Sequence, residues 1–138
     1  MQTADDLGLN GVAQTLLVPL CARAQAARLF PAASFRDASA ERIVDALGID
    51  PSSVVSDPIS ILGFISRARI FDRHVARFLA ANPNGIVLDL GAGLSTACER
   101  QPAAGAQWIC VDLPAVIALR RRIIPPAPHC RLVAASLD

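Results

Sequence analysis

The chain contains no lysine, so all thirteen basic side chains are arginine. We attribute this to codon composition, which would also explain the many alanines, rather than to chemistry. Only 18% of the 138 residues are charged, whereas 53% are hydrophobic. A disordered chain shows the opposite balance, so one domain with a real core is expected. The net charge of +1 excludes the strong basic field that attracts nucleic acid or an anionic membrane.

Cysteine is sparse, and the four cysteines are widely spaced along the chain. They are Cys21, Cys98, Cys110 and Cys130. No Cys-x-x-Cys pair is present, which argues against a bound metal or a redox motif. The acidic start lacks the basic region of a signal peptide, and no apolar run approaches the roughly 20 residues of a membrane span. We therefore expect a cytoplasmic protein with free thiols and no membrane partner.

The first half of the sequence predicts helices. Asn10 is a candidate cap for a helix over residues 11–30. A second helix over 38–47 is expected to end at Gly48, a common C-cap residue. Asp57 before a proline is typical of a helix start, and this third helix should run over 58–81, as far as an Asn-Pro-Asn-Gly turn.

The second half changes its pattern to short apolar runs of the buried-strand type. These runs cover residues 86–90, 107–112 and 130–134. Helix-compatible segments, 95–101 and 114–124, separate them. Strands that alternate with helices indicate parallel βαβ units. The expected fold class is therefore α/β, with a helical cap over residues 1–82 and a Rossmann-like βαβαβ segment over 83–138.

The strongest motif is the glycine turn that follows the first apolar run. Gly91 and Gly93 allow a sharp bend and a close approach of a ligand to the main chain. Dinucleotide enzymes place a glycine or alanine at a third position of this motif, which is Thr96 here. The Asp89 carboxylate would repel a pyrophosphate but suits the ammonium and sulfonium of S-adenosylmethionine. That cofactor is favoured over NAD(P), although a turn that binds nothing remains possible.

Asp112 ends the second apolar run. An acid about 20 residues beyond such a turn commonly accepts both ribose hydroxyls of an adenosine ligand. The alternative is that Asp112 only caps the helix that begins at Pro114. After the third run, Ser136 is a candidate partner for the adenine amino group, and a frayed terminus explains it equally well.

Arg67 is expected on an apolar face of the third helix. Its predicted neighbours there are Phe64, Phe71, Val75 and Phe78. An unpaired charge is expensive to bury, and the carboxylate of the cofactor's methionine would be a bidentate partner for the guanidinium. Exposure at the surface, or an ion pair with Asp72 or Asp89, would explain Arg67 equally well.

Together these motifs resemble the leucine carboxyl methyltransferase family, and within it the bacterial polyketide-tailoring O-methyltransferases. The matching patterns are R-x-R-x-x-D at residues 67–72, L-G-x-G-L-x-T at 90–96, and V-D-L-P-x-x-I-x-x-R-R at 111–121. Residues 11–24 also resemble the opening helix of the family. The resemblance extends over essentially the whole chain, with the motifs in the expected order.

The resemblance implies an S-adenosylmethionine-dependent O-methyltransferase with a small-molecule acceptor. Arg67 would hold the cofactor carboxylate, Gly91 and Gly93 would line its methionine, and Asp112 would take the ribose. Ala92 and Leu113 adjoin these residues and are included in the expected site.

Family members continue for about as much chain again, with four more strands, most of the substrate pocket, and the glycine-turn strand in the middle of the sheet. We therefore expect a truncated enzyme whose glycine-turn strand lies at a sheet edge. It would self-associate or bind a complementing C-terminal half. No catalytic residue is assigned, since neither His74 nor His129 has an evident orienting partner. The alternatives are a non-catalytic fragment and, less favoured, an NAD(P)-dependent reductase.

Overall fold

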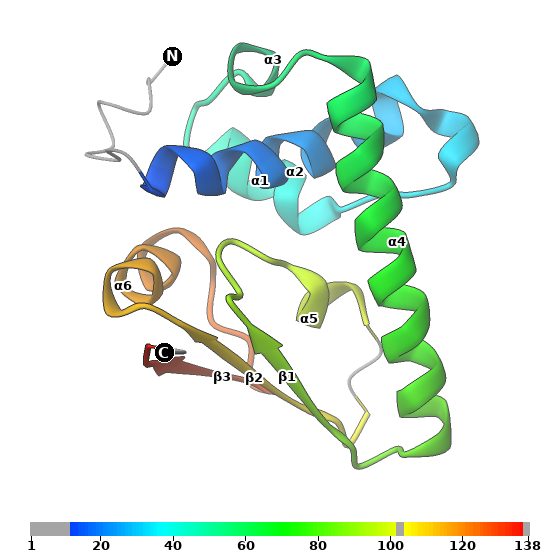
Figure 1. Cartoon of the computed structure of the whole chain (residues 1–138), viewed down its shortest axis with the longest axis vertical. Coiled ribbons are helices and arrows are strands. Elements are labelled where there is room, and N and C mark those ends of the chain that lie inside the picture. Colours follow the sequence, from blue (N-terminus) through cyan, green and yellow to red (C-terminus); the bar gives the residue numbers. More distant parts are fainter. Residues whose placement is uncertain (1–11, 102–103, 137–138) are drawn as a thin grey trace. The chain divides into compact units, whose positions relative to one another are not determined.

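The computed structural model describes residues 12–101 and 104–136. Asn10, proposed above as a helix cap, lies outside the described residues. The chain divides into two compact units, residues 1–69 and 70–138, and the long helix α4 (Pro58–Ala81) contributes to both. Figure 1 labels the elements of each unit. No helix within the described ranges is long and apolar enough to cross a membrane.

The first unit is helical, as predicted. It consists of α1 (Val12–Leu29), α2 (Ala38–Ala46) and the first part of α4, together with two shorter elements. These are the 3-10 turn η1 (Pro31–Ala33) and the single turn α3 (Pro51–Val54). The sequence did not indicate the two short elements, because one helical turn is too short to show a hydrophobic period.

The predicted helix ends agree with the observed caps. The Asp57 carboxylate accepts a hydrogen bond from the Ser60 main-chain N–H at 2.8 Å, which caps α4. Gly48, just after α2, has a φ of +63°, the left-handed conformation that favours glycine at this position. Local capping chemistry therefore sets both boundaries.

A buried ion pair ties α1 to α2 within this unit. Arg23 Nε donates to Asp37 Oδ2 at 2.9 Å, and the side chains are 9% and 0% exposed. The other oxygen of Asp37 accepts from the Ala40 N–H and caps α2. The surrounding core consists of Leu17, Leu20, Cys21, Ile43, Val44 and Ile61. Because Asp37 both pairs and caps, its charge is fully compensated.

The second unit is a three-stranded parallel sheet with two helices. Strands β1 (Ile86–Leu90), β2 (Gln107–Asp112) and β3 (Cys130–Ala134) lie in the order β1-β2-β3. The two helices are α5 (Ala97–Arg100) and α6 (Pro114–Ile123). The strands match the predicted ranges, and α5 is shorter than expected because the turn extends to Thr96. The α/β class and the βαβαβ order are confirmed.

Helices cover one face of this sheet, and apolar side chains of β1 are exposed on the other. Figure 1 shows α5 and α6 on one side, and α6 contacts both β2 and β3. On the opposite face, Ile86, Leu88 and Leu90 of β1 are 56%, 59% and 59% exposed. Parallel sheets are normally buried on both faces. Among the described residues, then, β1 is an edge strand with an uncovered apolar side, as expected.

An ion pair attaches α5 to the second half of α4. Arg100 donates from Nε and Nη2 to the two carboxylate oxygens of Asp72, at 2.8 and 3.0 Å. Gln101 Nε2 adds a hydrogen bond to the Asp72 carbonyl at 3.2 Å. The short helix that follows the glycine turn is thus attached to α4 by a charge-assisted, two-pronged ion pair.

Candidate functional site

The glycine turn connects β1 to α5 and has the backbone shape that the sequence predicts. Gly91 and Gly93 have φ values of +67° and +49°, a region where other residues are strained. A methyl group added at Gly91 would meet no atom within 4 Å. The backbone at Gly91 is therefore open to an approaching ligand.

The turn is attached to the end of the neighbouring strand. The main-chain N–H groups of Gly91 and Ala92 both donate to the carbonyl of Val111, at 2.9 and 3.1 Å. These bonds place the turn at the carboxyl ends of β1 and β2. Ligands of open α/β sheets bind at that edge.

Asp112 lies directly beside the turn, which brings together two motifs that the sequence placed in one site. Its Oδ2 accepts from the Gly93 N–H and its Oδ1 from the Leu113 N–H, both at 2.7 Å. A carboxylate offers about four acceptor positions, so lone pairs remain for ligand hydroxyls. The alternative that Asp112 caps α6 is not observed, because the N-cap residue is Leu113 and no side chain caps that helix.

Arg120 is a residue of this site that the sequence argument missed. It projects from α6, is only 2% exposed, and donates from Nη1 to the Gly93 carbonyl at 2.9 Å. A usable clue was present, because Arg120 follows the apolar Val116 and Ile117 at helical spacing and so lies on the buried face. An arginine there needs a polar partner, and Gly93 provides it.

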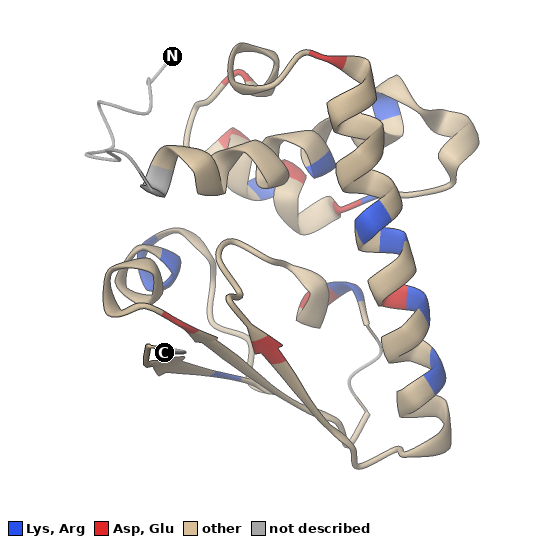
Figure 2. Ribbon diagram, viewed as in Figure 1, with Lys and Arg blue, Asp and Glu red and all other residues tan. Residues whose placement is uncertain are grey.

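Two other predicted site residues lie near the same edge. Asp89 is half-buried in β1 and pairs in register with Cys110. Ser136 is exposed and follows β3, where the Ala135 N–H donates to the Asp112 carbonyl at 3.0 Å. Figure 2 shows acidic positions near the ends of β1 and β2. The second unit therefore contains seven of the eight predicted site residues, near the carboxyl edge of the sheet, and only Arg67 belongs to the first unit.

The surroundings of Arg67 differ from the expectation. Arg67 is exposed, and Phe71 and Phe78 of the supposed apolar face are 60% and 44% exposed. Asp72, one of its suggested partners, pairs with Arg100 instead. The helical period was right, but the apolar face it defined is not buried by the described residues. Arg67 belongs to the first unit, and its role as a carboxylate ligand stays a prediction.

The sequence showed no orienting partner for either histidine, and the structure supplies one for His129. His129 Nε2 lies 2.9 Å from the Cys98 carbonyl, a structural contact that orients its ring. His74 is exposed on α4. Within residues 12–101 and 104–136, no group of three or more metal-binding side chains is suited to hold an ion.

Comparison with known proteins identifies a relative. No family model matches the chain. The tetracenomycin polyketide synthesis O-methyltransferase TcmP of Streptomyces glaucescens is 35% identical over 134 residues, which is 96% of this chain and 49% of the relative. The chain thus spans about half the length of this curated relative. The predicted resemblance to polyketide-tailoring O-methyltransferases is confirmed.

The left-handed turn predicts opposite effects for two alanine substitutions. Gly91→Ala should lower the free energy of unfolding by about 1–2 kcal/mol, because alanine is strained at positive φ. Gly63→Ala is the matched control, because Gly63 lies within α4 and an added methyl group also meets nothing within 4 Å. It should raise stability by up to about 1 kcal/mol. Urea denaturation measures both, and stabilisation by Gly91→Ala would contradict the assigned backbone.

Proposed function

We propose that this chain, a relative of a polyketide O-methyltransferase, carries the cofactor-binding part of an S-adenosylmethionine-dependent O-methyltransferase. The observation that supports it most is the hydrogen bond from the Gly93 N–H to Asp112 at the carboxyl edge of the sheet. It joins the open glycine turn to a carboxylate with unused acceptor positions. We infer a small-molecule methyl acceptor, because the relative is named as an O-methyltransferase of polyketide synthesis.

The proposed ligand placement follows from the groups that surround the turn. The methionine part would lie against Gly91, where the backbone is open, next to the buried Ala92. Asp112 accepts the two ribose hydroxyls, each as a charge-assisted hydrogen bond. Leu113, which is 48% exposed, offers an apolar surface to the adenine ring. Ser136 follows β3 at the same edge and is the proposed partner of the adenine amino group.

Electrostatics favours a cationic ligand over a dinucleotide. Asp89 and Asp112 place two carboxylates beside the turn, which attract an ammonium and a sulfonium and repel a pyrophosphate. The third position of the dinucleotide motif holds Thr96, which is fully buried and accepts from Arg100 Nη1 at 2.9 Å. A threonine fixed in this way supports the methyltransferase proposal over the NAD(P) reductase.

In the proposed reaction, the main task of the protein is to orient the cofactor and the methyl acceptor. Bound S-adenosylmethionine supplies a methyl group on a sulfonium that is already a good leaving group. Holding the cofactor in line with an acceptor oxygen contributes about 7–11 kcal/mol in favourable cases. A carboxylate acceptor needs no general base, whereas a hydroxyl acceptor does, and we assign none among the residues of this chain.

Membership of the leucine carboxyl methyltransferase family also belongs to this proposal, together with a complementing C-terminal half. The exposed Ile86, Leu88 and Leu90 on the edge strand support it, because such a face is normally covered in a parallel sheet. The alternative is that a second copy of the chain covers the same face. A non-catalytic cofactor-binding fragment is the alternative function.

The ribose contact predicts a loss of affinity when Asp112 is removed. In calorimetric titrations the chain should bind S-adenosylmethionine, and Asp112→Ala should weaken binding tenfold or more, about 1.4 kcal/mol. Asp45→Ala is the matched control, because Asp45 is an exposed carboxylate in α2, and it should leave affinity unchanged. Tighter binding of NADH than of S-adenosylmethionine would refute the proposal. So would an equal affinity of Asp112→Ala and Asp45→Ala for S-adenosylmethionine.

The predicted role of Arg67 is tested with a ligand that lacks the carboxylate. Arg67→Ala should weaken binding of S-adenosylmethionine about tenfold and leave binding of decarboxylated S-adenosylmethionine unchanged. Arg73→Ala, an exposed arginine on the same helix, should affect neither ligand. An equal loss for both ligands would mean that Arg67 acts through the fold, and no loss would place the carboxylate elsewhere.

A further inference from the structure

Three cysteines that are far apart in sequence meet within the second unit. Cys98 of α5, Cys110 of β2 and Cys130 of β3 form this thiol cluster. The Cys110 and Cys130 sulfurs are 3.3 Å apart, and the Cys98 thiol also hydrogen-bonds to Cys130. Cys98 and Cys110 are 3% and 1% exposed, whereas Cys130 is half-buried. Cys130 is therefore the member of the cluster that a solute reaches.

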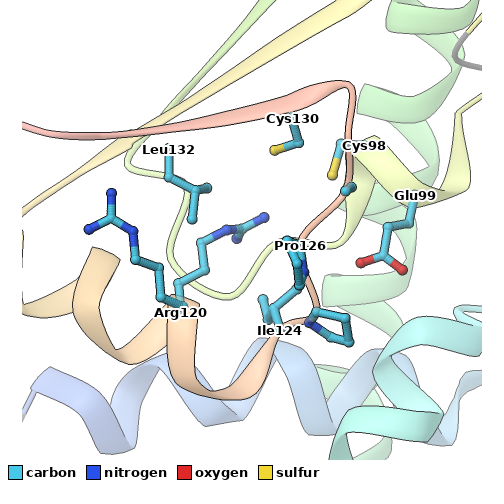
Figure 3. A pocket seen from close by; sticks show the side chains of 10 residues that line it. Cys98, Glu99, Arg120, Ile124, Pro126, Cys130 and Leu132 are labelled. Carbon is cyan, nitrogen blue, oxygen red and sulfur yellow. The ribbon is translucent and has the colours of Figure 1, made fainter.

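Cys130 opens into a cavity of about 380 Å³ in the second unit. The cavity is lined by Cys98, Arg120, Arg121, Pro126, Cys130 and Leu132, among others. Figure 3 shows the Cys98 and Cys130 sulfurs at one end, across from Arg120. Two arginines against the single acid Glu99 give the lining a positive balance. A small anionic molecule fits this charge.

The surroundings of Cys130 favour its thiolate. Hydrogen bonds from the other two thiols and the nearby Arg120 and His129 hold the pKa of Cys130 below its usual value, although burial opposes them. The same hydrogen bonds, together with burial, raise the pKa values of Cys98 and Cys110. Those two thiols therefore act as donors, and Cys130 is the nucleophile of the cluster.

Strand register argues against a disulfide between the two closest sulfurs. Cys110 pairs with Leu132 and Cys130 pairs with Trp108, so the two cysteines are diagonal neighbours. In a parallel pair, an offset of two residues along strands about 4.8 Å apart separates the Cα atoms by roughly 8 Å, beyond the usual Cα separation of a disulfide. The contact is a sulfur–sulfur hydrogen bond rather than a covalent bond, and Cys130 lines the cavity.

We propose that Cys130 is a thiolation site that reacts with a low-molecular-weight disulfide carrying carboxylates, bound in the cavity beside Arg120 and Arg121. The Cys130 sulfur attacks one sulfur of the disulfide, whose S–S bond breaks as the new S–S bond forms. The other half leaves as a thiolate and takes a proton from water. Cys130 is oxidised and the leaving half is reduced, so no further oxidant is needed.

The first test treats the full chain with glutathione disulfide and locates adducts by mass spectrometry. One glutathionyl group should appear, on Cys130. The reaction rate should vary little from about pH 6 to 8, whereas an ordinary thiol with a pKa near 8.5 slows about tenfold per unit below that value. Cys21→Ser is the matched control, since burial raises the pKa of Cys21 to about 12, and it should leave the rate unchanged.

A substitution series separates activation by the cluster from simple exposure. Cys98→Ala removes a donor and should move the rate profile of Cys130 to higher pH. Cys98→Ser keeps a hydrogen-bond donor, so its profile of rate against pH should lie closer to that of the parent chain. Equal profiles for both variants and the parent chain would overturn the assigned role of the cluster.

The charge of the cavity provides the last test. Glutathione disulfide should react faster than the cationic disulfide cystamine. Arg121→Ala should bring the ratio of the two rates closer to one. Arg122→Ala is the control, because Arg122 is exposed and does not line the cavity. Equal rates for both disulfides, an adduct on another cysteine, or an internal disulfide in place of an adduct would overturn the proposal.

Discussion

The main chain of Gly93 is bonded to two opposite charges, and these bonds connect the glycine turn to β2 and α6. Its N–H donates to the Asp112 carboxylate at 2.7 Å, and its carbonyl accepts from the Arg120 guanidinium at 2.9 Å. Both are charge-assisted hydrogen bonds, which are shorter and stronger than neutral ones. Together they fix the left-handed turn against the end of β2 and against α6. The shape of the turn is therefore set by residues of the chain itself.

These two side chains connect the proposed cofactor site to the thiol cavity. Asp112 presents its remaining acceptor positions at the carboxyl edge of the sheet, where the ribose is proposed to bind. Arg120 lines the cavity that contains Cys130. Gly93 thus bonds to one residue of the site proposed for a cationic nucleoside and to one residue of the cavity suited to an anionic disulfide.

The sequence predicts the elements of this fold better than their contacts. The three strands are short apolar runs with turn residues at their ends, and α4 begins at an Asp-Pro pair, so local chemistry defines them. The Arg100–Asp72 pair, the buried Arg120 and the thiol cluster each join residues far apart in sequence, which periodicity cannot reveal. For Arg67 the sequence left burial and exposure open, and the structure shows exposure, because no described residue buries Phe71 and Phe78 on the same helix. The uncovered face of β1 has the same origin, since burial depends on what packs against a surface.

The most direct test of the central claim is an NMR titration of the chain with S-adenosylhomocysteine, observed at the backbone amides. The Gly93 N–H is bonded to the carboxylate that should take the ribose, so it is the most sensitive reporter. We expect the largest chemical-shift changes at the amides of Gly91, Gly93, Asp112 and Leu113. Gly105 precedes β2 at the opposite end of that strand, so the chemical shift of its amide should not change. Shifts that spare Gly93 and Asp112, or that NADH reproduces equally well, would contradict it.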